Sequence, residues 1–219
     1  MPCGLRLITE TDNLFFEDSF VYICTKSLTR MDTLQVIEYI AVASGIIHVF
    51  LLTREKIIAW PFGILTVSLY IYIFSVSKLY SDVILHVVYV ILNIYGWWNW
   101  ARRAQTAEHV PISRLSGRET GAWAGLILIG FLLWGYTMQA NTDASFPYRD
   151  AFTTVASLVA QFQLARKKLE NWIIWIIVDV VAITIYGLKG LYPTTGLYIV
   201  YLLLSTKGFL DWRRTMRAG

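Results

Sequence analysis

The chain has 219 residues, of which 56% are hydrophobic and 16% are charged, and its mean hydropathy is +0.53. Long apolar runs bounded by charged residues are typical of an integral membrane protein rather than a soluble domain. The formal net charge of +4 does not indicate nucleic-acid binding, because the basic residues stand at the ends of apolar runs. The two cysteines and three histidines lack metal-ligand spacing, so neither a metal nor another cofactor is predicted.

Residues 1–33 precede the first apolar run and lack the basic and apolar regions of a signal peptide. Cys3 and Cys24 lie here and would form a disulfide only on an oxidising side of the membrane, so their pairing stays open. A short helix that lies in the membrane interface is predicted here, with an apolar side formed by Leu14, Phe15, Phe20, Ile23 and Leu28. The acidic residues Glu17 and Asp18 weaken this prediction.

Seven apolar runs follow, and a helix of about 20 residues crosses a bilayer core of ~30 Å. The runs are 34–53, 57–76, 80–100, 121–140, 150–165, 171–189 and 192–210, of which the fifth is the shortest. The predicted fold is therefore all-α and integral to the membrane, with seven transmembrane helices. Its parts are an N-terminal segment 1–33, a three-helix bundle 34–103, a linker with the fourth helix 104–149, a second three-helix bundle 150–214 and a tail 215–219.

Basic residues alternate between the connections and indicate how the helices are oriented. Three connections hold one basic residue each, namely Lys78, Arg149 and Lys189. The other connections and the tail hold two or more, namely Arg54, Lys56, Arg102, Arg103, Arg114, Arg118, Arg166, Lys167, Lys168, Arg213, Arg214 and Arg217. Because Lys and Arg are enriched on the cytoplasmic side, the C-terminus is predicted to be cytoplasmic and the N-terminus outside.

The chain repeats itself with a shift of 112 residues and no gap. The segment Gly96-Trp-Trp-Asn-Trp-Ala-Arg matches Gly208-Phe-Leu-Asp-Trp-Arg-Arg. Further matches are Glu38 with Asp150, Arg54 with Arg166, Trp60 with Trp172, Tyr80 with Tyr192, Trp100 with Trp212, and Arg102 with Arg214. Runs one to three and five to seven are therefore predicted to be two copies of one unit. The single helix between them makes the copies parallel, an architecture of transporters whose site lies between the halves near the midplane.

The sixth run holds the strongest candidate site. Asp179 lies near its middle, and a carboxylate there costs at least ~2.5 kcal/mol on insertion scales, so acids at this depth are functional by default. Trp172 and Trp175 precede Asp179 by seven and four residues and share its helix face. Two indole rings and a carboxylate on one face would bind a flat polar or cationic molecule. The alternative for Trp172 is an aromatic anchor at the membrane interface.

The third run carries His86, Asn93 and Trp97 at steps of seven and four, which keep them on one helix face. The amide of Asn93 donates and accepts hydrogen bonds, so it suits a carboxamide or a ribose. These residues are predicted to bind substrate. The alternative for Asn93 and His86 is hydrogen bonding between helices, which polar residues in membranes also perform.

The fifth run carries a polar stripe of Asp150, Thr154, Ser157 and Gln161 along an otherwise apolar helix. Gln161 is predicted to reach the substrate. Ser157, Asp150 and Glu38, which is the mate of Asp150 in the repeat, are predicted to have gating or structural roles, the latter two at the outer helix ends.

In the fourth run, Gly121 and Gly125 have GxxxG spacing, which lets another helix approach closely. The fourth run belongs to neither copy of the repeat. It is therefore predicted to pack between the halves or between protomers.

The runs NIYGWWNW (93–100) and ENWIIWIIVDV (170–180), the repeat, and the Asp-Ala-Phe start of the fifth run resemble the PnuC family of bacterial vitamin transporters. The resemblance covers most of residues 34–214. It implies a seven-helix fold related to the SWEET sugar transporters. It also implies facilitated diffusion of nicotinamide riboside across the inner membrane, with a cytoplasmic kinase that traps the product by phosphorylation. A homo-oligomer, with a trimer among the options, is predicted as well.

The resemblance leaves the vitamin open. Relatives carry thiamine or riboflavin, and it implies amides in riboside carriers at the positions of His86 and Asp179. Pyridinium and thiazolium cations both stack on indoles, so Asp179 does not separate the riboside from thiamine. A seven-helix receptor is a more distant alternative, because a receptor does not require an internal repeat and so leaves the repeat of this chain unexplained. An enzyme is not predicted, because the sequence shows neither a paired acid and base nor a metal cluster.

Overall fold

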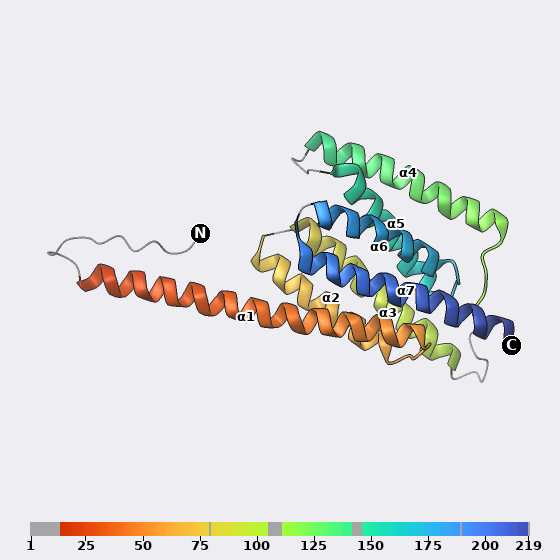
Figure 1. Ribbon diagram of the computed structural model, residues 1–219, viewed down its shortest axis with the longest axis horizontal. Coiled ribbons are helices and arrows are strands. Elements are labelled where there is room, and N and C mark those ends of the chain that lie inside the picture. Colours follow the sequence, from red (N-terminus) through yellow and green to blue (C-terminus); the bar gives the residue numbers. More distant parts are fainter. Residues whose placement is uncertain (1–13, 79, 105–110, 142–145, 189, 219) are drawn as a thin grey trace.

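The computed structural model describes residues 14–78, 80–104, 111–141, 146–188 and 190–218, and these form seven α-helices (Figure 1). The helices are α1 Leu14–Thr53, α2 Ala59–Val76, α3 Tyr80–Ala104, α4 Gly117–Asn141, α5 Pro147–Ala165, α6 Asn171–Leu188 and α7 Tyr192–Ala218. Pro61, Pro147 and Pro193 stand in the first turns of α2, α5 and α7, where a helix needs no amide donor. The all-helical fold class is thus confirmed.

Five helical segments are long and apolar enough to cross a membrane, namely Thr33–Thr53, Ala59–Val76, Asp82–Arg102, Gly117–Asn141 and Asn171–Leu188. In the described part of the chain, α5 and α7 do not reach that hydropathy. For α5 the lower hydropathy fits its position, since nine of its 19 residues are buried inside the bundle, including Ser157, Gln161 and Gln163. A helix that faces protein rather than lipid tolerates polar side chains.

α1 is one continuous helix of 40 residues. The sequence predicted a short interfacial helix followed by a separate first span, but the structure has one element from Leu14 to Thr53. Its side chains are described from Thr33 onward. The apolar side predicted for the interfacial helix and the pairing of Cys3 with Cys24 lie outside the described side chains.

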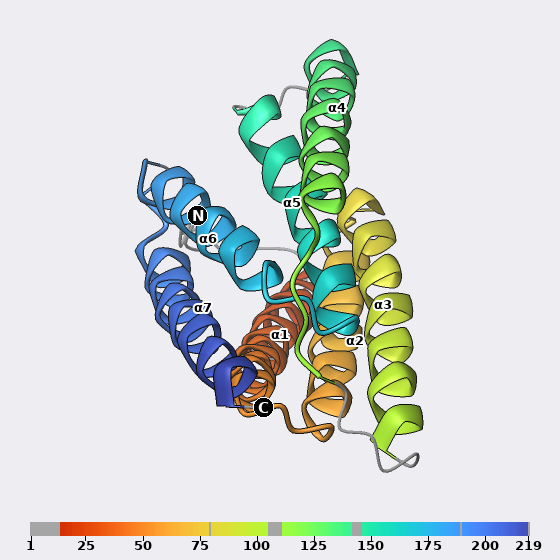
Figure 2. The same ribbon diagram turned by 90° about the vertical axis from the view of Figure 1, so that its right-hand side faces the viewer.

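Six helices form a closed ring. α1 packs against α2 and α7, α2 against α3, α3 against α5, and α6 against α5 and α7. The order around the ring is therefore α1, α2, α3, α5, α6 and α7. α4 lies outside the ring and packs on α5, at the edge of the bundle in both views (Figures 1 and 2).

The glycines through which α4 packs are not the predicted ones. Gly121 and Gly125 have open space around them, so the prediction that they pack between the two halves is wrong. α4 instead approaches α5 at Gly130, where a Cβ would lie 2.9 Å from Val155, and at Gly135. GxxxG spacing permits close approach but does not determine which face meets a neighbour. Their predicted contact with another protomer stays a prediction.

Four tryptophans form a buried cluster, which we call the tryptophan cluster: Trp60, Trp100, Trp172 and Trp212, each at most 1% exposed. Trp60 and Trp100 meet edge to face at 5.3 Å and 85°, and Trp172 and Trp212 do so at 5.4 Å and 89°. The indole nitrogens of Trp100 and Trp212 each donate at 3.1 Å to a backbone carbonyl in the last turn of α5 and of α1, respectively. The cluster therefore ties the two halves together.

The α1–α2 loop, residues 54–58, and the α5–α6 loop, residues 166–170, have matching backbones. Glu55 and Lys167, 112 residues apart, both adopt left-handed conformations with φ of 55° and 52°. Five backbone hydrogen bonds at the first loop, of 3.0–3.2 Å, recur 112 residues later at 3.0–3.3 Å. The ammonium of Lys167 pairs with the Glu55 carboxylate at 2.7 Å and lies 4.7 Å from the ring centre of Trp100. The loops are thus joined by a direct ion pair.

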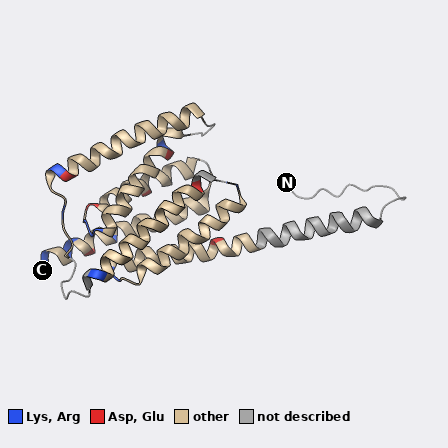
Figure 3. Cartoon of the chain, turned by 180° about the vertical axis from the view of Figure 1, so that it is seen from behind, with Lys and Arg blue, Asp and Glu red and all other residues tan. Residues whose placement is uncertain are grey.

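Most Lys, Arg, Asp and Glu residues lie near the ends of the helices (Figure 3). We call the end that carries loops 54–58 and 166–170 and the last turns of α7 the basic end. Arg166, Lys168 and Arg213 are among its residues. This distribution is what the sequence predicted for helices bounded by charge.

Gly96→Ala is expected to lower the stability of the purified protein by about 1–3 kcal/mol, the usual cost of overpacking. Gly96 lies against the Trp60 ring, and a Cβ there would overlap the indole. The measurement is the thermal midpoint of unfolding in detergent, with unfolding monitored by tryptophan fluorescence. Gly121→Ala is the matched control, because it also adds a methyl group in a helix but into open space. Equal midpoints for the two variants would contradict the packing role.

Candidate substrate-binding site

A polar seam joins α3 and α5 in the middle of the bundle. Nε2 of Gln161 donates to Oδ1 of Asn93 at 3.4 Å, and Nδ2 of Asn93 donates to the carbonyl of Tyr89 at 2.8 Å. The hydroxyl groups of Tyr89 and Ser157 lie 2.5 Å apart. Asn93, Gln161 and Ser157 are at most 6% exposed. The structure thus brings together Asn93, Gln161 and Ser157, which the sequence placed on two separate helices.

A second polar group lies between α6 and α7. The hydroxyl of Ser205 donates to Oδ2 of Asp179 at 3.0 Å, and Asp179 is 2% exposed. Asp179 therefore faces the protein interior, as the cost of a carboxylate in lipid requires. A carboxylate accepts up to about four hydrogen bonds, so Asp179 has acceptor capacity beyond the Ser205 contact.

Three tyrosines of α6 and α7 pack against one another inside the bundle. Tyr198 stacks on Tyr186 at 5.3 Å and 14° and meets Tyr201 edge-on at 6.1 Å and 82°. A Cβ at Gly45 of α1 would lie 2.6 Å from the Tyr201 hydroxyl oxygen, so a phenol of the second half reaches the first half. Phenol groups donate and accept hydrogen bonds, so these tyrosines add polar groups to the interior of the bundle.

Gly63 brings the backbone of α2 close to the polar seam. A Cβ at Gly63 would overlap Oδ1 of Asn93 and would lie 2.6 Å from Cε1 of His48. His48 in turn lies with Nδ1 2.7 Å from the Ala59 carbonyl oxygen. The residue 112 positions after Gly63 is Trp175, so one half has no side chain where the other has an indole. This difference makes the interior of the bundle asymmetric.

The tryptophans predicted to bind substrate lie in different environments. Trp172 is 1% exposed in the tryptophan cluster and lies against Gly208, so its interpretation as an interfacial anchor in lipid is wrong. Trp175 is partly buried and packs against the hydrophobic core. Trp97 is 42% exposed, which is at odds with a place in a buried site. For Trp172, Trp175 and Trp97, substrate contact stays a prediction.

His86 lies among aromatic rings of α2 and α3. Its ring centre is 4.9 Å from Phe74 and 5.8 Å from Tyr89, and its Nδ1 lies 2.9 Å from the Asp82 carbonyl oxygen. Contact with Tyr89 connects His86 to the polar seam. Its role in substrate binding stays a prediction.

The two acids at the outer helix ends lie apart from the polar seam. Glu38 is exposed on α1, and Asp150 is partly buried in the first turn of α5. Their gating or structural role stays a prediction.

Sequence reasoning missed Tyr198, Tyr201 and Ser205. Tyr198 and Ser205 occupy positions 112 residues after the candidates His86 and Asn93, so applying the repeat to each candidate would have found them. Tyr201 lies 112 residues after Tyr89, which was not a candidate, so the repeat gave no signal for it. Tyrosine and serine in an apolar helix otherwise give little signal, because tyrosines often anchor membrane interfaces and serines often bond within their own helix.

Known proteins are similar to this chain over most of its length. The family model described as nicotinamide mononucleotide transporter matches residues 35–214. The nicotinamide riboside transporter PnuC of Escherichia coli is 28% identical over 207 residues, covering 83% of this chain and 86% of the relative. The riboflavin/roseoflavin transporter RibM of Streptomyces davaonensis is 26% identical over 171 residues, covering 77% and 80%.

The fold is similar to one that has been solved. A crystal structure of the vitamin B3 transporter PnuC matches with a TM-score of 0.69 at 23% identity, covering 94% of both chains. This likeness supports the arrangement of seven helices, and the resemblance to PnuC is confirmed. Because the family model spans residues 35–214, the chain belongs to the nicotinamide mononucleotide transporter family, a family of membrane transporters and not of enzymes.

Proposed function

We propose that this transporter carries nicotinamide riboside by facilitated diffusion. The observation that carries the proposal is the set of buried hydrogen-bonding groups in the middle of the bundle, around Asn93, Gln161 and Asp179. Amides suit a carboxamide, and a carboxylate suits ribose hydroxyls or a pyridinium cation. Trp175 would stack on the ring, and His86, Trp97 and Trp172 complete the predicted set. The relatives named nicotinamide riboside transporters favour this substrate.

Riboflavin is the alternative that a specific observation favours, because the riboflavin/roseoflavin transporter RibM is also a relative. Thiamine stays a second alternative, since its thiazolium is a cation that would stack on an indole as a pyridinium does. The three ligands differ in charge and size, so binding separates them.

The test is a titration of the purified protein with nicotinamide riboside, thiamine and riboflavin, each followed by calorimetry. Tryptophan fluorescence gives a second readout for the riboside and thiamine, because the chain has nine tryptophans. We expect the riboside to bind at least tenfold more tightly than the other two. Tighter binding of riboflavin would transfer the proposal to that vitamin, and binding of none would refute it.

We infer that the two halves are parallel 3+1+3 repeats related to the SWEET fold. Three features support this. Exchanging the two halves, with corresponding residues 112 apart, maps the contacts α1–α2, α2–α3 and α3–α5 onto α5–α6, α6–α7 and α7–α1. The two edge-to-face tryptophan pairs have the same geometry. The loops at Glu55 and Lys167 share their hydrogen bonds and their left-handed conformation.

We propose that the protein lies in the bacterial inner membrane with its basic end in the cytoplasm, by the enrichment of Lys and Arg on that side. The C-terminus is then cytoplasmic and the N-terminus outside. A green fluorescent reporter fused after Gly219 is expected to fluoresce, and an alkaline phosphatase fusion there to be inactive. An active phosphatase fusion would reverse the orientation.

Facilitated diffusion alone only equalises concentrations, so net uptake needs a trap. We propose that a cytoplasmic kinase phosphorylates the riboside after entry, which adds charge and prevents its return. We also propose a homo-oligomer, a trimer among the options, in which α4 supplies the contact. The exposed apolar side chains of α4, such as Leu128, Ile129 and Leu133, support a face covered by lipid or by another copy.

A further inference from the structure

Residues 111–116, which we call the strap, cross the basic end and enter α4. The strap pairs with the α5–α6 loop as a short parallel bridge. The amide of Ser113 donates to the Lys167 carbonyl at 3.1 Å, and the amide of Leu169 donates to the Ser113 carbonyl at 3.0 Å. The backbone of the strap is therefore fixed to the second half of the molecule.

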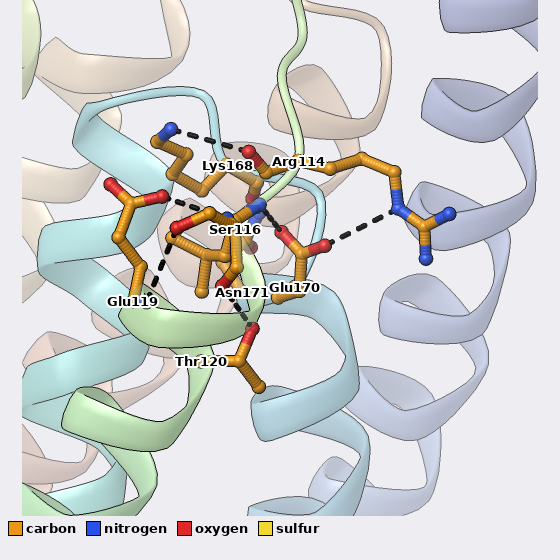
Figure 4. Close-up of polar contacts among 8 residues, drawn as sticks. Arg114, Ser116, Glu119, Thr120, Lys168, Glu170 and Asn171 are labelled. Atoms are coloured by element: carbon orange, nitrogen blue, oxygen red, sulfur yellow. Dashed lines mark hydrogen bonds and ion pairs between the residues drawn. The ribbon is translucent and has the colours of Figure 1, made fainter.

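Glu170 holds the strap through a side chain (Figure 4). One carboxylate oxygen accepts the Leu115 amide at 3.0 Å, and the other pairs with Nε of Arg114 at 3.5 Å. Nζ of Lys168 donates to the Arg114 carbonyl at 3.4 Å. All these partners lie in residues 167–170, so the side-chain contacts also attach the strap to the second half.

The buried side chain of Ile112 anchors the strap in the protein interior. It is 7% exposed and belongs to the hydrophobic cluster that contains Leu52 and Trp60 of the first half and Leu164 and Trp172 of the second. The same cluster includes all four tryptophans. Ile112 therefore closes the basic end where the two halves meet, although its backbone is fixed to only one of them.

Buried polar atoms without a hydrogen-bond partner gather at this end. In the part of the chain that the structure describes, they are Nε1 of Trp60 and Trp172, the amide atoms of Gln163, and Oδ1 of Asn171. Buried polar groups have a hydrogen-bond partner in more than about 90% of cases, so several buried atoms without one at a single end of the bundle call for an explanation. Entry of water or of a hydroxyl-rich substrate on separation of the halves would satisfy these atoms.

We propose that the strap is the gate of the transport path at the basic end, with Ile112 as its plug and Glu170 as the latch that keeps it on the second half. Opening separates the Glu55–Lys167 ion pair and withdraws Ile112 from the first-half residues of the hydrophobic cluster, while the bridge between Ser113 and the α5–α6 loop persists. This inference rests on the proposed transport function, and it assigns which contacts break and which hold.

Two cysteine pairs separate the contacts that break from those that hold, in a background with Cys3 and Cys24 changed to serine. Ser113→Cys with Lys168→Cys joins bridge partners, whose strand spacing of ~4.7–4.9 Å suits a disulfide. Glu55→Cys with Lys167→Cys joins the two halves through a short bis-methanethiosulfonate reagent, which forms a disulfide with each thiol and is therefore released by reduction. Flux of nicotinamide riboside into proteoliposomes is measured before cross-linking, after it, and after reduction.

We expect the 113–168 cross-link to leave the flux within twofold and the 55–167 cross-link to lower it at least tenfold, with recovery on reduction. Loss of flux with the 113–168 link would mean that the strap must leave the second half and would overturn the proposal. Unchanged flux with the 55–167 link would overturn it as well, because the halves would then not separate at this end.

A second measurement does not depend on the transported vitamin. Ile112→Cys is expected to react slowly with a charged thiol reagent, and at least tenfold faster when Glu170→Gln is added. Glu119→Gln is the matched control, because that acid accepts a hydrogen bond from the Ser116 amide within the strap, whereas Glu170 holds the strap from the second half. Equal rates in the Glu170 variant and the control would overturn the latch. If riboside flux is absent in the unaltered protein while these rates differ as expected, the proposed substrate fails and the gate stands.

Discussion

Asp179→Asn is expected to weaken nicotinamide riboside binding by about 1–3 kcal/mol, about 5- to 150-fold, because a charge-assisted contact at a desolvated site is lost. The substitution keeps the shape and the contact with Ser205. A neutral analogue, the reduced riboside, is expected to lose much less. The measurement is calorimetric titration of both proteins with both ligands. Equal losses for the two ligands would contradict charge recognition, and no loss for either would remove Asp179 from the site.

Two controls accompany the Asp179 experiment. Ser205→Ala removes the hydrogen-bond donor but keeps the carboxylate, so it is expected to preserve the preference for the cation. Asp150→Asn removes an acid at the outer end of α5 and is expected to leave both affinities within about twofold. A large effect of Asp150→Asn would indicate that the loss follows from the net charge of the bundle rather than from contact.

Trp175→Ala is expected to weaken riboside binding at least fivefold, from the loss of one aromatic contact with a cation worth about 1 kcal/mol or more. Trp175 occupies the position that Gly63 has in the first half, so its indole has no counterpart at the equivalent position of the first half. Trp98→Ala is the matched control, because Trp98 is 53% exposed and its ring faces Arg102 at 5.3 Å. Equal affinity in folded Trp175→Ala and Trp98→Ala would place Trp175 in packing only.

The sequence predicted the helices well, because each apolar run is bounded by charge and helix ends follow those charges. The run predicted at 171–189 is α6 at Asn171–Leu188, and the run at 192–210 begins α7 at Tyr192. The sequence did not predict how α4 packs. Its pattern of small residues offers several close approaches, and only tertiary contacts select Gly130 and Gly135 over Gly121 and Gly125.

The candidate site was predictable in its residue types but not in its pairs. Asn93 and Gln161 were singled out as polar groups in apolar helices, yet their mutual contact depends on how α3 meets α5. The burial of Ile112 had no sequence signal, since one isoleucine in a polar connection is ordinary. The same holds for the ion pair of Lys167 with Glu55, because charges at helix ends normally face water.

The ion pair between Glu55 and Lys167 bears on how the halves recognise each other. In a symmetric dimer of the first half alone, glutamate would face glutamate at this point, and in a dimer of the second half lysine would face lysine. Like charges brought together repel, whereas the single chain places opposite charges 2.7 Å apart. Either half expressed by itself would therefore be discouraged from pairing with its own copy. When the halves are produced as separate chains, this contact favours the mixed pair.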